Sequence, residues 1–171
     1  MTKPTFWGPM SARILWVALI GMAIDQAFKL WMLFGYDIAA RGRVELTPFL
    51  DLVMIWNYGI SYGLLQQDGS LGRWLLIAAT LVITIVFWIW GARSDRPLQA
   101  LSLALVIGGA LGNGIDRIAY GAVADFFHVH VGDFSWYVFN LADVWIVAGV
   151  AGLLYDSFRS GPNDAAKTPS M

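Results

Sequence analysis

The sequence of 171 residues contains no cysteine, and only 13% of its residues are charged. The lack of cysteine excludes a disulfide framework, a thiol nucleophile, a thiolate metal site and a lipid anchor carried on cysteine. The low charge content, together with 58% hydrophobic residues, leaves too little polar surface for an ordinary soluble domain. A formal net charge of -1 offers no basic surface for nucleic acid. These deficits predict an integral membrane protein.

Long apolar runs, by contrast, are abundant, and four of them are long enough to span a bilayer core of about 30 Å. They cover approximately residues 14–34, 74–91, 98–118 and 138–156. Many of the nine tryptophans lie near the ends of these runs, as expected at membrane interfaces. We therefore expect an all-α membrane protein with a single domain, 1–159, and a disordered cytoplasmic tail, 160–171. No small-residue cleavage site follows the first run, so we expect it to be retained as a helix.

The connections between the apolar runs differ in character. The loop 35–73 is long, and its part 44–57 is rich in β-formers and interrupted by Pro48, so we expect short strands that form a small extracytoplasmic cradle or lid. Four crossings bring this loop and the loop 119–137 to one face of the membrane. Outside the polar motifs, lysine and arginine are more numerous on the opposite face, which also holds both termini. The positive-inside rule therefore predicts that both termini are cytoplasmic.

Polar residues that are costly in lipid concentrate between Gly108 and Asp143, and such residues are functional candidates. Asp125 and Asp143 have no Lys or Arg within four residues, whereas Asp116 is followed directly by Arg117. If the loop brings Asp125 and Asp143 together, two carboxylates in a low dielectric share one proton. Such a pair can act as general base and general acid on a water, as in aspartic proteases. The alternative is that Asp143 caps or packs its helix and Asp125 is an ordinary loop residue.

Other polar residues in the apolar runs are more typical of structural roles. Asp25 and Lys29 lie one helical turn apart in the first run, which favours an ion pair that holds this helix to its neighbours. Asn113, Asp116 and Arg117 follow the spacing i, i+3, i+4 and predict a polar network. The same run carries glycines at spacings that permit close helix packing: Gly108, Gly109, Gly112 and Gly114.

Three further features could contribute to a site. Asn140 precedes the second aspartate by three residues and can orient its carboxylate or bind a substrate carbonyl. Gly59 and Gly63 supply backbone that a ligand can approach closely. His128 and His130 would share one face of a strand and could bind a metal. Nothing obliges them to meet the aspartates, so we expect an interfacial role for them, and neither a metal nor another cofactor.

Five motifs, in order, resemble those of the bacterial lipoprotein signal peptidase (signal peptidase II) family. They are Asp25-Gln26-x-x-Lys29, Asn57-x-Gly59, Gly108-Gly109-Ala110-x-Gly112-Asn113-x-x-Asp116-Arg117, Gly121-x-Val123-x-Asp125-Phe126 and Phe139-Asn140-x-Ala142-Asp143. The resemblance implies an aspartic endopeptidase in which Asp125 and Asp143 are catalytic. It further implies that the other polar motif residues support the site or contact the substrate: Asn57, Gly59, Asn113, Arg117, Asn140, Asp116, Asp25 and Lys29.

The same resemblance implies the substrate and the location. The enzyme would remove the signal peptide of a prolipoprotein immediately before a diacylglyceryl-modified cysteine, using water and no metal. It would lie in the bacterial inner membrane as a multi-pass monomer in contact with membrane lipid, with its active site near the extracytoplasmic surface.

Two other classes of protein fit parts of the pattern. A transporter or channel subunit could use Asp25, Asp116 and Asp143 as a proton or cation path, but it would distribute polar residues through the membrane and usually contain a repeat. The run 74–90 has no charge, and the sequence has no visible repeat. A non-enzymatic assembly factor would explain the packing glycines but not the two aspartates without a neighbouring cation.

Overall fold

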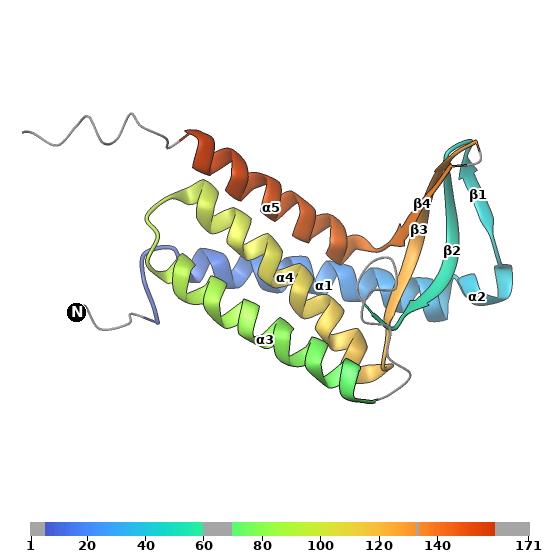
Figure 1. The fold of residues 1–171 in the computed structure, drawn as a ribbon, viewed down its shortest axis with the longest axis horizontal. Helices are drawn as coiled ribbons and strands as arrows, with labels where there is room; N and C mark the ends of the chain where they lie inside the picture. Colours follow the sequence, from blue (N-terminus) through green and yellow to red (C-terminus); the bar gives the residue numbers. More distant parts are fainter. Residues whose placement is uncertain (1–5, 60–69, 133, 160–171) are drawn as a thin grey trace, which may run out of the picture.

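A computed structural model describes residues 6–59, 70–132 and 134–159 of the chain. Four long helices run side by side as a bundle, and a four-stranded sheet stands across one end of it (Figure 1). The tail 160–171 and Gly63, for which expectations were stated above, lie outside the described residues.

The four long helices have the length and hydropathy needed to cross a membrane, which confirms the predicted class of fold. They are α1 (Ser11–Leu30), which continues as the π-helical turn η1 (Trp31–Gly35), α3 (Ser70–Ala92), α4 (Pro97–Ala119) and α5 (Leu141–Arg159). A short helix, α2 (Ile38–Arg41), follows η1. The last span begins at residue 141 and not near 138, because the residues before it belong to a strand.

The sheet is antiparallel throughout, in the order β1-β2-β3-β4. Its strands are β1 (Val44–Thr47), β2 (Leu50–Asn57), β3 (Val123–Val131) and β4 (Phe134–Phe139). The strands predicted for the first connection are confirmed, but they form only half of the sheet. The other half comes from the second connection, which was expected as a loop, with a strand considered only around His128 and His130. A lone hairpin is marginal in water, and pairing β2 with β3 joins two hairpins into a sheet of four strands.

Helix α4 lies at the centre of the bundle: 61% of its most apolar window is buried, against 17–22% in the other three spans. Glycines allow this central position. A side chain at Gly108 would collide with the backbone of Ala18 in α1, and one at Gly109 would collide with the carbonyl of Ala142 in α5. The predicted role of these glycines in close helix packing is therefore confirmed for the contacts of α4 with α1 and α5.

A buried cluster of charges joins α1 to α4. The Lys29 ammonium lies 2.9 Å from a carboxylate oxygen of Asp25 and 2.8 Å from one of Asp116, and it donates to the Asn113 side-chain oxygen at 3.0 Å. All three charged side chains are at most 2% exposed. Gln26 adds a hydrogen bond from its amide to the other Asp116 oxygen at 2.9 Å. The cluster thus pairs one cation with two anions and satisfies them with neutral amides.

The same two carboxylates hold distant backbone. Asp25 accepts the backbone N–H of Ala142 at 2.9 Å, at the start of α5. Asp116 accepts the backbone N–H of Ala124 at 3.1 Å, in β3. Between these contacts, Gly121 has φ +83, which allows the chain to leave α4 and turn directly into β3. The charge cluster therefore fixes where β3 and α5 begin relative to the bundle.

The first prediction concerns the contact between α4 and α5. Gly109→Ala should lower the free energy of unfolding by about 1–3 kcal/mol, because the added methyl meets a backbone carbonyl that cannot rotate away. Gly114→Ala, in the same helix, is the matched control: its methyl would meet only the Thr80 methyl, so its effect should be near zero. Denaturant titrations in detergent, followed by tryptophan fluorescence, measure both. Equal stability of the two variants would contradict the prediction.

The second prediction concerns the charge cluster. Lys29→Met should lower the free energy of unfolding by about 3–5 kcal/mol, because two buried carboxylates lose their cation. Arg96→Met is the control: Arg96 pairs with Asp156 at 2.8 Å but is 39% exposed, so its loss should cost less than about 1 kcal/mol. The same titration compares them, and a Lys29 variant within about 1 kcal/mol of the wild type would refute a stabilising role.

Candidate active site

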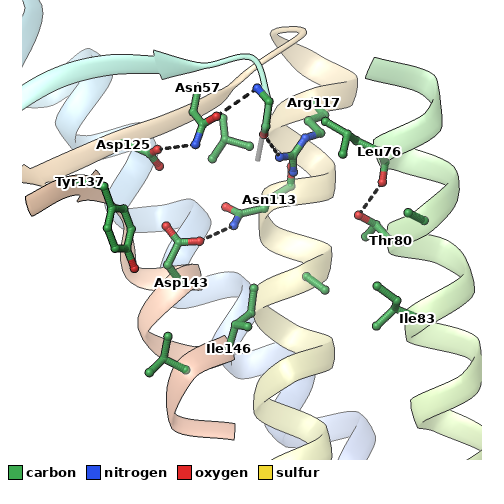
Figure 2. Close-up of a pocket in the computed structure, with 15 residues that line it drawn as sticks. Asn57, Leu76, Thr80, Ile83, Asn113, Arg117, Asp125, Tyr137, Asp143 and Ile146 are labelled. Carbon is green, nitrogen blue, oxygen red and sulfur yellow. Dashed lines mark hydrogen bonds between the residues drawn. The ribbon is translucent and has the colours of Figure 1, made fainter. Parts of the chain in front are cut away.

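Asp125 and Asp143 line one pocket of about 370 Å³, between the sheet and the helix ends (Figure 2). Asp125 comes from β3 and Asp143 from the first turn of α5. The remaining lining residues come from the end of β2 and the residues just after it, from α3, α4 and α5, and from β3 and β4: Asn57, Gly59, Leu76, Ala79, Thr80, Ile83, Ala110, Asn113, Arg117, Val123, Tyr137, Ile146 and Val147. Two carboxylates that are 18 positions apart in the chain thus share one cavity.

Asp125 is 2% exposed and is held by two side-chain amides. Asn140 donates to one carboxylate oxygen at 2.5 Å, and Asn57 donates to the other at 3.1 Å. Burial and the neighbouring charge of Asp143 raise the pKa of Asp125 to about 7, against the lowering effect of the two amide hydrogen bonds. Near neutral pH this carboxyl therefore exists in both its protonated and its ionised form.

Asp143 and Asn140 cap the N-terminus of α5 reciprocally. The Asn140 side-chain oxygen accepts the backbone N–H of Asp143 at 3.1 Å, and the Asp143 carboxylate accepts the backbone N–H of Asn140 at 3.2 Å. Its other oxygen accepts a hydrogen bond from Asn113 at 3.0 Å. The positive end of the helix dipole also favours a negative charge here. Asp143 thus has the capping role considered above, and its carboxylate nevertheless faces the pocket.

Arg117 lies beside the two carboxylates, but its hydrogen bonds go to backbone. It donates to the carbonyl of Gly59 at 3.0 Å and to the carbonyl of Asn113 at 3.3 Å, and it attracts both Asp125 and Asp143 electrostatically. Gly59 in turn donates its N–H to the Asn57 side chain at 3.1 Å. These contacts tie the end of β2 to α4 above the pocket (Figure 2).

The residues singled out in the sequence fall into two groups. Four supporting residues line the pocket with the aspartates: Asn57, Gly59, Asn113 and Arg117. Asn140 is fully buried and joins Asp125, Asn113 and the start of α5. The other three, Asp25, Lys29 and Asp116, do not line it, and they lie behind it in the charge cluster.

The two histidines lie elsewhere. His128 and His130 are in β3, and their rings stack with centroids 5.4 Å apart. Both contact the buried Asp51 of β2, at 3.4 and 2.9 Å, and Arg43 contacts the same oxygen at 2.6 Å. Burial alone would raise the pKa of Asp51, but the contact with His130 and the charge of Arg43 hold it below its usual value. Within the described ranges, no group of three potential ligands is arranged to hold a metal.

Two residues near the site received no role from the sequence. Gln26 binds the Asp116 carboxylate and the Gly112 carbonyl, and a polar amide within an apolar run was a visible signal for it. Tyr137 lines the pocket from β4, and nothing in the sequence distinguishes it from the neighbouring aromatic residues.

Solved structures show the same fold. One bacterial membrane enzyme determined by the in meso method has a TM-score of 0.75 over 94% of both chains, at 23% identity. Another gives a TM-score of 0.74 over 87% of this chain and 94% of that one, at 22% identity. At such identities the likeness concerns the fold alone.

Sequence comparisons are more specific. The family model described as Signal peptidase (SPase) II matches residues 17–159. The lipoprotein signal peptidase of Methylorubrum extorquens is 54% identical over 147 residues, which cover 85% of this chain and 86% of that protein. That of Nitrobacter hamburgensis is 54% identical over 165 residues, which cover 94% and 99%. Since the family model spans most of the chain and the relatives share half of its residues, the chain belongs to the signal peptidase II family.

Proposed function

We propose that this multi-pass membrane protein is an aspartic endopeptidase that cuts prolipoproteins immediately before a diacylglyceryl-modified cysteine, with Asp125 and Asp143 as the catalytic pair. One observation carries the proposal: two carboxylates from separate elements line one pocket, and the pKa of Asp125 is raised to about 7. A pair that shares one proton near neutral pH contains both the acid and the base that peptide hydrolysis requires.

In the proposed mechanism the pair starts with one proton, on Asp125, and with Asp143 ionised. Asp143 takes a proton from a water, and the oxygen of that water attacks the scissile carbonyl carbon. Asp125 then gives its proton to the leaving nitrogen as the carbon–nitrogen bond breaks. One water is consumed, and a carboxylic acid and an amine are released. The proton that Asp143 took from the water then passes to Asp125, which restores the starting state of the pair.

The supporting residues keep this geometry. Asn57 and Asn140 hold the two oxygens of Asp125, and Asn113 holds Asp143. The Arg117 guanidinium supplies positive charge next to the carbonyl oxygen that becomes negative in the transition state. Asp25, Lys29 and Asp116 act through the backbone, by fixing the residues directly before the two aspartates.

A lipid-modified substrate suits the walls of the pocket. Ile83 of α3 and Ile146 of α5 lie on the side of the pocket away from the sheet (Figure 2), Ala79 and Val147 also line it, and all four side chains are apolar. Both helices are candidate membrane spans. The acyl chains of the cysteine can therefore stay in the bilayer between α3 and α5 while the scissile bond reaches the carboxylates. Every residue in this scheme comes from one chain, so we propose that a monomer is functional.

The proposed orientation puts the sheet end of the bundle on the outer side of the membrane. The opposite end holds the start of α1, the connection from α3 to α4 and the end of α5 (Figure 1). That end carries Arg13, Arg93, Arg96 and Arg159, and the positive-inside rule favours the cytoplasm for it. The pocket then opens where the signal peptide of an exported protein leaves the membrane.

The third prediction tests the catalytic pair. Asp125→Asn and Asp143→Asn should each lower kcat/KM for a lipidated prolipoprotein about 1000-fold or more, because an amide neither gives nor takes the required proton. Asp37→Asn, an exposed aspartate at the start of α2, is the control and should keep wild-type activity. Release of the signal peptide by purified enzyme is the measurement, with thermal unfolding to verify folding.

The wild-type enzyme should also leave an unlipidated version of the same prolipoprotein uncut. Cleavage of neither substrate by the wild type would refute the endopeptidase. Wild-type rates in either asparagine variant would refute the assignment of the pair.

The fourth prediction concerns pH. Because Asp125 must hold a proton and its pKa is about 7, kcat/KM should fall as the pH rises above about 7. The Asn57 amide stabilises the ionised form of Asp125 and lowers its pKa. In Asn57→Ala the decrease of kcat/KM with rising pH (the falling limb of the pH profile) should therefore begin at higher pH. Thr80→Val is the control, since the Thr80 hydroxyl bonds within its own helix. Profiles of kcat/KM between about pH 5 and pH 9 give the limb, and an unmoved limb in Asn57→Ala contradicts the prediction.

A further inference from the structure

Tyr137 of β4 forms one wall of the pocket that holds both carboxylates. Figure 2 shows its ring beside Asp143, across the pocket from Leu76, Thr80 and Ile83 of α3. We infer that Tyr137 is a specificity-determining residue, whose ring limits the size of the substrate side chain immediately before the scissile bond. The inference rests on the proposed function and adds a residue that none of the five motifs contains.

The sheet is irregular beside this ring. His128 pairs with Val138 and His130 pairs with Ser135, so β4 has one residue more than β3 between these pairs. This β-bulge sets Tyr137 and its neighbour Trp136 against a single residue of β3. Bulges of this kind re-aim side chains, and here the two aromatic rings come within 5.9 Å of each other.

The pairing also settles which face of the sheet the ring occupies. Phe139 pairs directly with Phe127, and directly opposite residues share a face. Asp125 precedes Phe127 by two residues and Tyr137 precedes Phe139 by two, so the alternation of side chains gives them that face as well. The Tyr137 ring and the Asp125 carboxylate therefore lie on the same side of the sheet.

A row of aromatic contacts braces this wall. The Tyr137 ring lies 5.8 Å from that of Phe139, Phe139 lies 5.7 Å from Phe127, and Phe127 stacks on Phe28 of α1 at 5.5 Å. The ring of Trp136 supports the other side. Tyr137 cannot retreat from a large substrate group without moving this row, and a stiff wall discriminates by size more strongly than a mobile one.

The substrate residue that meets this wall follows from the chemistry of the proposed reaction. The residue after the scissile bond is always the lipidated cysteine, whose acyl chains lie along the apolar walls of α3 and α5. The residue immediately before the bond carries the scissile carbonyl, so its side chain is the nearest one to the carboxylates that can vary in size. A cavity of about 370 Å³ must also hold the backbone around the bond and a water, so little room remains beside Tyr137.

The experiment compares lipidated prolipopeptides that carry Ala or Leu immediately before the cysteine. The wild type should prefer Ala by about tenfold or more in kcat/KM, since an excess of even one methylene is worth that factor in a closed site. Tyr137→Ala and Tyr137→Val should each raise, by about tenfold, the ratio of kcat/KM for the Leu substrate to kcat/KM for the Ala substrate. Tyr137→Val introduces a β-branched residue that suits a strand, so it serves if the alanine variant does not fold.

Two further variants make the result specific. Tyr137→Phe should keep the wild-type ratio, because it preserves the ring that forms the wall. Tyr155→Ala removes a tyrosine that is 60% exposed on α5 and outside the pocket, and it should also keep the ratio.

The inference is overturned if the wild type does not discriminate, if both small variants of Tyr137 keep the wild-type ratio, or if Tyr137→Phe shifts the ratio as far as Tyr137→Val does. These outcomes differ from a failure of the proposed function, in which the wild type cuts neither substrate.

Discussion

Lys29, the buried cation of the charge cluster, determines where Asp125 and Asp143 stand. Its ammonium holds Asp25 of α1 against Asp116 of α4, and burying two anions without it would be costly. The second oxygen of Asp25 accepts the backbone N–H of Ala142, and the Asp116 oxygen that contacts Lys29 also accepts the backbone N–H of Ala124. Ala142 and Ala124 each stand directly before a pocket aspartate. The positions of the proposed catalytic groups therefore depend on an ion cluster that neither of them joins.

Neutral amides connect this cluster to the pocket without adding charge. An asparagine side chain both donates and accepts, so Asn113 accepts hydrogen bonds from Lys29 and Asn140 and donates one to Asp143. Arg117, the cation nearest the pocket, gives its hydrogen bonds to backbone carbonyls. A carboxylate bound directly to a lysine or arginine would stay ionised, whereas amide donors and burial together leave the pKa of Asp125 close to 7.

Much of this arrangement is visible in the sequence, because it depends on local spacing. Apolar runs locate the four spans, i, i+4 spacing predicts the Asp25–Lys29 pair, and i, i+3 spacing brings Asn140 to Asp143. What depends on pairing between distant segments is not visible. Strand β3 meets β2 about 70 residues away in the chain, so the second hairpin went unpredicted. The face that Tyr137 occupies follows from the pairing of Phe139 with Phe127, which exists only once β3 and β4 are aligned.

The distribution of polar groups along the bundle separates hydrolysis from transport. A proton path needs polar groups from one membrane face to the other. Here the sheet end holds the charge cluster and the pocket, whereas the half of the bundle farther from the sheet is filled by a buried apolar cluster that includes Ile14, Ala100, Ala104 and Ile107. Hydrolysis needs water, substrate and proton from only one side. The apolar cluster in the half farther from the sheet therefore separates the proposed catalytic aspartates from the opposite face of the membrane.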